Sequence, residues 1–219
     1  MVSDMKKTFP RILLVLFGII AGIVVSGAVY AFTGFSIFGK FDDDVRPTAK
    51  TDNAGLTALA YDILTYIKEG DYAALSREAH PEFGVVFSPC ATIALSTNRC
   101  FRADQIASFG GDTTLYVWGV RSGSGEPIEM TPADYFARYV FDRDYTSAAI
   151  VGVNQVIRSG NALENFAEFF PYAKFVDFYM SGGEGDASAG PGWSSIRLGF
   201  EEYDGALRLT VIIHSEWTE

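Results

Sequence analysis

Hydrophobic and polar residues along this chain separate an apolar N-terminal stretch from one patterned domain. No charged side chain occurs between Arg11 and Lys40. The apolar run Ile12–Phe32 alone has about the length of a helix that crosses a bilayer, roughly 20 residues. Three cations precede this run, so the positive-inside rule places the N-terminus in the cytoplasm and the rest of the chain outside.

We therefore predict a single-pass protein of the cell membrane with four parts. They are a cytoplasmic tail (1–11), a transmembrane helix (12–38), a polar linker (39–53) and an extracytoplasmic domain (54–219). A cleavable signal peptide is the alternative, because Val29-Tyr30-Ala31 has the small residues of a cleavage site. The apolar region of such a peptide is shorter, roughly 7–15 residues, so we expect an uncleaved anchor.

The domain opens with two predicted helices. Apolar residues recur at helical spacing from Leu56 to Ile67, and Gly70 follows as a stop signal. A shorter helix is expected over 72–79. It should end at His80-Pro81, because the residue before a proline avoids the helical region.

Two later helices are expected. Thr131 is a typical N-cap and Pro132 suits the first helical position. The apolar face of this helix would consist of Tyr135, Phe136, Tyr139 and Val140. A further helix is expected over 161–170, with Glu164 as a capping partner and Pro171 just beyond its end.

The C-terminal third has the pattern of antiparallel strands. A strand is expected over 175–180, and Ile196, Leu198 and Phe200 alternate with polar or small residues. Asp204-Gly205 is a strong hairpin signal. The returning strand would present the core-facing row Leu207, Leu209, Val211 and Ile213, so strict alternation places His214 on the opposite face.

Strands are also expected over 85–87 and 115–120. Helices early in the domain and a strand meander late are typical of the α+β class. We therefore expect helices packed on one face of a curved antiparallel sheet, in a cone-shaped roll.

The excess of acidic residues in this chain restricts the kinds of molecule that it is expected to bind. The chain has 17 basic and 27 acidic residues, and 13 basic and 26 acidic ones follow Lys40, a net charge of −13 for that part. Such a surface repels phosphate backbones, which argues against nucleic acid as a partner. A cation, a basic peptide or simple solubility is compatible with it.

The two cysteines, Cys90 and Cys100, both lie in the predicted extracytoplasmic domain. Outside the cytoplasm such a pair can close a loop, so we predict a disulfide, with two free thiols as the alternative. A metal site would need more sulfur or a nearby histidine, and we expect neither a metal nor a cofactor.

Motifs for catalysis are sparse. The chain has no nucleophile elbow, phosphate loop, dinucleotide fingerprint or paired-histidine motif. Its only histidines are His80 and His214, so imidazole chemistry would depend on them. Asp177 in an aromatic strand and Glu126 beside a proline are candidate carboxylates. A structural role is the alternative for each of these four residues.

Three tryptophans, Trp118, Trp193 and Trp217, are candidates for the lining or rim of a ligand pocket. Core packing is the alternative explanation for the aromatic residues.

Several short segments together resemble a known family. They include His80-Pro81-Glu82, Phe87-Ser88-Pro89, Tyr116-Val117-Trp118-Gly119 and Ile212-Ile213-His214. They resemble an uncharacterised extracytoplasmic domain of bacterial lipoproteins and envelope proteins, a relative of NTF2-like and cystatin-like rolls. The resemblance covers Leu56 to Thr218 and implies the fold and the location, but no reaction. This chain departs from the family at Cys90 and over 181–190, and in having a membrane span in place of a lipid.

Two hypotheses about function follow. The first is a non-catalytic envelope module that binds a small ligand or an envelope protein. The alternative is an enzyme of the hydrolase or isomerase type, which would use a histidine with a neighbouring carboxylate.

Overall fold

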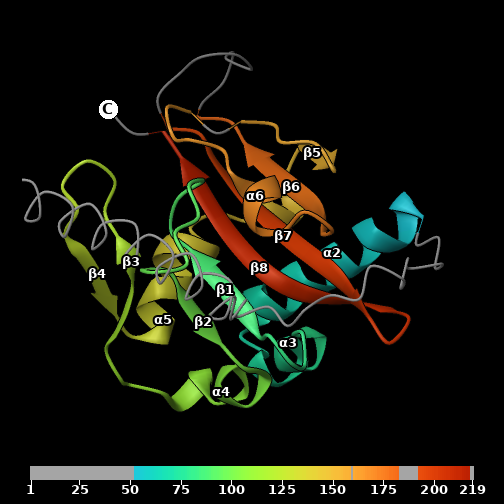
Figure 1. The fold of residues 1–219 in the computed structure, drawn as a ribbon, viewed down its shortest axis with the longest axis horizontal. Coiled ribbons are helices and arrows are strands. Elements are labelled where there is room, and N and C mark those ends of the chain that lie inside the picture. Colours follow the sequence, from blue (N-terminus) through green and yellow to red (C-terminus); the bar gives the residue numbers. More distant parts are fainter. Residues whose placement is uncertain (1–51, 159, 183–191, 218–219) are drawn as a thin grey trace, which may run out of the picture. The chain divides into compact units, whose positions relative to one another are not determined.

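A computed structural model describes residues 52–158, 160–182 and 192–217 (Figure 1). The predicted tail, the anchor over 12–38 and nearly all of the linker lie outside these residues. Among the described residues, no helix combines the length and the hydropathy needed to cross a bilayer.

The centre of the domain is a mixed sheet of six strands in the order β2-β1-β8-β7-β6-β5. Its strands are β1 (Val85–Ser88), β2 (Arg99–Phe101), β5 (Ile150–Val153), β6 (Lys174–Met180), β7 (Ser194–Tyr203) and β8 (Ala206–Glu216). β1 runs parallel to β8, with Val86 opposite Val211, whereas the other neighbours are antiparallel.

The α+β class is confirmed, but the predicted antiparallel roll is wrong. The strand pattern of 85–87 gave no sign of its partner, because a strand near the start of the domain can add to the sheet in either direction. Here it lies beside the last strand, and that pairing is parallel.

A separate hairpin and several short helices complete the domain. The hairpin consists of β3 (Tyr116–Val120) and β4 (Pro127–Met130). The helices are α2 (Asn53–Glu69), α3 (Tyr72–Glu78), α4 (Ala103–Ala107), η1 (Phe109–Gly111), α5 (Pro132–Tyr135), η2 (Phe136–Val140), η3 (Tyr145–Ser147) and α6 (Phe166–Phe169).

The main core lies between one face of the sheet and α2. The prediction for this helix is confirmed: Leu56, Ile63 and Ile67 are buried, and Gly70 ends the helix in the left-handed conformation. Sheet residues such as Val176 and Leu198 belong to the same cluster. In Figure 1, α2 passes behind the long strands β7 and β8.

The other face of the sheet is also covered, which corrects the expectation that helices pack on one face alone. A second cluster there joins Phe166 and Phe170 to Val211 and Ile213, and α6 lies in front of the sheet in Figure 1. The helix predicted over 161–170 is limited to Phe166–Phe169.

A bulge in β8 overturns the predicted alternation. The ladder pairs Leu209 with Phe200 and Val211 with Gly199, so Thr210 is an extra residue. Beyond this point each residue of β8 lies on the face opposite to the one that strict alternation predicts. Ile212 joins the main core, whereas Val211 and Ile213 face the second cluster. His214 is therefore fully buried.

Gly199 allows the second face to close. A Cβ atom at this position would lie 2.6 Å from Val211 Cγ1 and 3.0 Å from the ring of Phe166. We predict that Gly199→Ala lowers the free energy of unfolding by about 1–3 kcal/mol, the usual cost of overpacking. Urea denaturation followed by tryptophan fluorescence measures this change.

Gly111→Ala is the matched control, because a Cβ there meets no atom within 4 Å. Equal losses in the two variants would contradict this account of the packing around Gly199.

Candidate functional site

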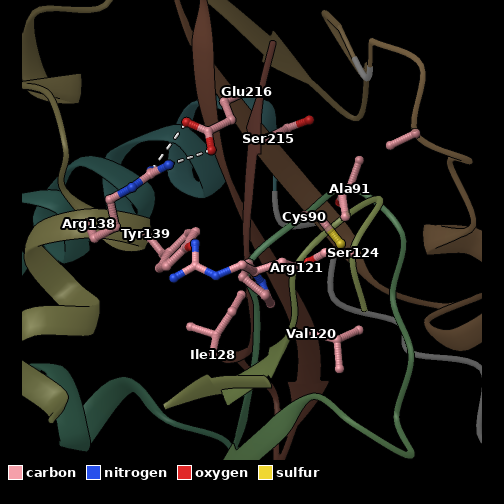
Figure 2. Close-up of a pocket in the computed structure, with 13 residues that line it drawn as sticks. Cys90, Ala91, Val120, Arg121, Ser124, Ile128, Arg138, Tyr139, Ser215 and Glu216 are labelled. Atoms are coloured by element: carbon pink, nitrogen blue, oxygen red, sulfur yellow. Dashed lines mark hydrogen bonds and ion pairs between the residues drawn. The ribbon is translucent and has the colours of Figure 1, made fainter. Parts of the chain in front are cut away.

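A cavity of about 200 Å³ opens at the end of β8, between the β3–β4 hairpin, the segment after β1 and η2 (Figure 2). Its apolar wall includes Ala91, Val120 and Ile128. Its polar residues include Cys90, Arg121, Arg138, Tyr139 and Glu216. The lining residues come from five separate stretches of sequence, so only the fold brings them together.

Two of these residues come from a π-helical turn. The N-cap Thr131 begins α5 as predicted, but after Tyr135 the chain widens into the π-helix η2. Arg138 on this turn forms a bidentate ion pair with Glu216, with N–O distances of 2.7 and 3.2 Å. Arg138 is therefore charge-compensated within the cavity.

Tyr139 forms the wall beside this ion pair. The guanidinium of Arg138 lies 4.5 Å from the centre of its ring, and Tyr139 is 5% exposed. Its hydroxyl has no hydrogen-bond partner among the described residues. A hydroxyl in such a place is available to a ligand.

Arg121 supplies a cation without a counter-charge. Its backbone closes the β3–β4 hairpin, because its N–H donates to Glu126 O at 2.8 Å and its carbonyl accepts from Gly125 N at 3.0 Å. Its side chain forms no ion pair with any described residue. Figure 2 shows it pointing across the cavity toward Tyr139. With Arg138 neutralised by Glu216, the cavity has a net charge of +1.

The first predicted histidine is structural. The Nδ1 atom of His80 accepts from the backbone N–H groups of Glu82 and Phe83, at 3.3 and 3.1 Å. Its ring stacks on Phe83 and is 3% exposed. Burial lowers the pKa of His80, outweighing the attraction of Glu82. His80 therefore holds the turn after α3.

The second histidine has a carboxylate neighbour that the sequence did not indicate. His214 Nε2 lies 3.3 Å from Asp142 Oδ1, and Asp142 also accepts from the Tyr145 hydroxyl at 2.6 Å. The Tyr145 hydroxyl lies 2.8 Å from Ser194 Oγ. No hydrogen bond of good geometry reaches either ring nitrogen of His214 from the described residues, and the side chain is 0% exposed.

Asp177 and Glu126 do not form a pair. Glu126 lies on the exposed β3–β4 turn, whereas Asp177 is fully buried on the second face of the sheet. Asp177 Oδ2 lies 3.4 Å from Arg197 Nη2, and it accepts from Ile157 N at 3.0 Å. Burial raises the pKa of Asp177 despite the opposing effect of Arg197.

Arg197 makes this cluster structural. It is 1% exposed and also donates to Glu164 Oε2 at 2.8 Å. The predicted capping residue Glu164 therefore anchors the segment before α6 to the sheet. Removing one partner of such a buried pair is strongly destabilising.

Two of the three tryptophans, Trp118 and Trp193, are buried, whereas Trp217 is 39% exposed. Trp118 is fully buried, stacks on Tyr135 at 3.9 Å and donates from Nε1 to Met130 O, so it is a core residue. Trp193 and Trp217 lie together at a second depression of about 420 Å³, away from Arg121. The guanidinium of Arg158 lies 5.5 Å from the centre of the Trp193 ring.

Both cysteines are free thiols, so the predicted disulfide is absent from the structure. The β1–β2 ladder pairs Cys100 with Val86, whereas Cys90 follows the end of β1. The Cys90 thiol contacts Thr92 O and the Cys100 thiol contacts Phe83 O. The described residues also contain no cluster of three possible metal ligands.

No protein-family model, no curated protein and no solved structure matches this chain. The resemblance to the bacterial envelope family therefore stays a prediction, and the site is interpreted from its own geometry.

The cluster around Asp142 predicts an effect of pH on stability. Burial alone would raise the pKa of Asp142, but the His214 imidazole and the Tyr145 hydroxyl hold it below its usual value. This contribution to stability is present above the unfolded pKa of about 3.9 and is lost as the pH falls through the lower folded pKa. We expect wild type to exceed Asp142→Asn in stability most at pH 6, with a smaller difference at pH 2.5.

Urea denaturation at a series of pH values measures this difference. The exposed Asp134→Asn is the control, for which we expect no comparable trend. A constant gap between wild type and Asp142→Asn over this range would contradict the assignment.

Proposed function

We propose that residues 54–217 form a non-catalytic binding module, held outside the membrane by the apolar segment 12–38, which takes a small anionic ligand in the cavity at Arg121. The observation that carries this proposal is that Arg121 and Tyr139 line the same cavity, and that neither the guanidinium of Arg121 nor the hydroxyl of Tyr139 has a side-chain partner among the described residues. A carboxylate would accept from both groups, because charge-assisted hydrogen bonds are the stronger kind.

The charge of the cavity favours an anion over a cation. The part of the chain after Lys40 has a net charge of −13, yet the cavity walls carry two guanidiniums against the single carboxylate of Glu216. Since Glu216 already forms an ion pair with Arg138, its carboxylate is not a free counter-charge for a cationic ligand. An anion that binds the exposed Arg121 breaks no ion pair among the described residues.

The size and the wall of the cavity restrict the ligand further. A volume of about 200 Å³ is below the roughly 300–1,000 Å³ of drug-sized sites. Val120 and Ile128 supply apolar surface beside the guanidinium. A short-chain carboxylate matches this combination of one charge and a small apolar body.

The enzyme alternative gains no support from the histidines. His80 and His214 are 3% and 0% exposed, respectively, and neither lines the cavity. A general base must come within hydrogen-bond reach of the substrate. Binding without catalysis is therefore the function that the geometry favours.

Butyrate and its neutral amide, butyramide, test the proposal. We expect butyrate, but not butyramide, to shift the NMR signals of Arg121 and Tyr139, with a Kd on the order of 1 mM. Arg121→Gln should weaken butyrate binding about tenfold or more, because a charge-assisted hydrogen bond contributes roughly 1.5–3 kcal/mol.

Arg99→Ala is the matched control. Arg99 is exposed and lies over the rings of Phe101 and Tyr116, outside the cavity. Equal shifts with butyramide, or unchanged butyrate binding in Arg121→Gln, would overturn the proposed anion site.

Cell fractionation tests the location. We expect the full chain in a bacterial host to stay with the membrane after an alkaline carbonate wash, and a chain without residues 1–38 to be released. Protease added outside the inner membrane should digest the domain. A shortened chain in the soluble fraction would contradict the anchor and favour a cleaved signal peptide.

A further inference from the structure

The cavity contains one group that carboxylate binding does not use, the free thiol of Cys90. This residue is half-buried and lines the same cavity as Arg121, as Figure 2 shows. Its S–H group donates to Thr92 O at 3.2 Å, a weak bond that leaves the sulfur available. Tyr139, 5% exposed and without a hydroxyl partner among the described residues, is a second polar group of this cavity that is available to a ligand.

We propose that Cys90 is a site of thiol–disulfide exchange with small disulfides that carry a carboxylate, which Arg121 and Tyr139 bind. This inference rests on the proposed anion site and names the class of ligand for which that site is built. The outcome is a mixed disulfide between Cys90 and a short thiol acid whose carboxylate stays at Arg121.

The exchange balances without any further oxidant. The Cys90 thiolate attacks one sulfur of the small disulfide R–S–S–R, the S–S bond of the reagent breaks, and a bond forms between Cys90 and one R–S group. The second R–S⁻ leaves and takes up the proton that Cys90 gave up. Cys90 is oxidised and the leaving sulfur is reduced.

Arg121 contributes to this reaction through its charge. Its guanidinium attracts the carboxylate of the reagent and so raises the local concentration of the disulfide at the cavity. This effect does not reach Cys100, which lies on β2 outside the cavity.

The two cysteines make the inference testable within one molecule. Cys100 is the more exposed residue, but burial of its sulfur raises the pKa of the Cys100 thiol. Absolute rates at the two cysteines therefore do not report recognition. The ratio of the rates with an anionic and a neutral disulfide at each cysteine does.

The experiment uses the full chain, purified in detergent and fully reduced. It is treated at pH 7.5 with 3,3′-dithiodipropionate, which is anionic, or with 2-hydroxyethyl disulfide, which is neutral. Peptide mapping by mass spectrometry gives the rate at each cysteine, and N-acetylcysteine amide corrects for the intrinsic reactivity of each reagent. We expect Cys90 to prefer the anionic reagent about tenfold after this correction, and Cys100 to show no preference.

Variants separate recognition from access. Arg121→Gln should abolish the preference at Cys90, while Arg99→Ala and Cys100→Ser should preserve it. Arg121 and Arg99 are both exposed, so both variants are expected to fold, and circular dichroism verifies this. A preference that is absent in wild type, or that survives in Arg121→Gln, would overturn the exchange proposal.

Butyrate distinguishes the failure of this inference from the failure of the proposed function. Protection of Cys90 by butyrate supports both proposals. Butyrate shifts at Arg121 without any anionic preference at Cys90 would overturn the exchange alone, whereas the absence of both effects would overturn the anion site as well.

Discussion

The extra residue in β8 determines what lies at the cavity. Because Thr210 has no partner in the ladder, the residues that follow it change faces. His214 then meets the ring of Tyr139, and two residues later Glu216 meets Arg138. Strict alternation would have turned both side chains away from η2. The inserted residue therefore brings Glu216 to Arg138, and among the described residues that line the cavity Arg121 stays the cation without a counter-charge.

The buried charged residues Arg197 and Asp177 lie on the sheet and do not line the cavity. The guanidinium of Arg197 lies beside the paired rings of Phe166 and Phe175, with its central carbon 5.8 and 5.2 Å from their centres. It also pairs with Asp177 and Glu164. An ion pair in such a place adds little net stability compared with apolar residues. It does require one arrangement of the segment before α6, because any other would leave Arg197 buried and unpaired. The segment before α6 therefore covers the second face of the sheet in one defined arrangement.

Local signals in the sequence predicted the elements well where the cause is itself local. Gly70 ends α2 because glycine tolerates the left-handed conformation, and the Asp204-Gly205 turn has positive φ angles at both residues. The parallel partner of β1 and the bulge at Thr210 depend on contacts between distant segments. No periodicity within a strand reveals them, so the faces of His214 and Glu216 could not be predicted.

The same limit explains why the candidate site was missed. The predicted site residues include the rare types histidine and tryptophan, and the fold buries both histidines, Trp118 and Trp193. The cavity instead depends on an arginine and a tyrosine, residue types too common to stand out. Within the cavity, Arg121 differs from Arg138 because it has no counter-charge among the described residues, whereas Arg138 has Glu216. The proposed ligand-binding role of Arg121 therefore rests on the absence of a counter-charge in the cavity, and that property exists only once the chain has folded.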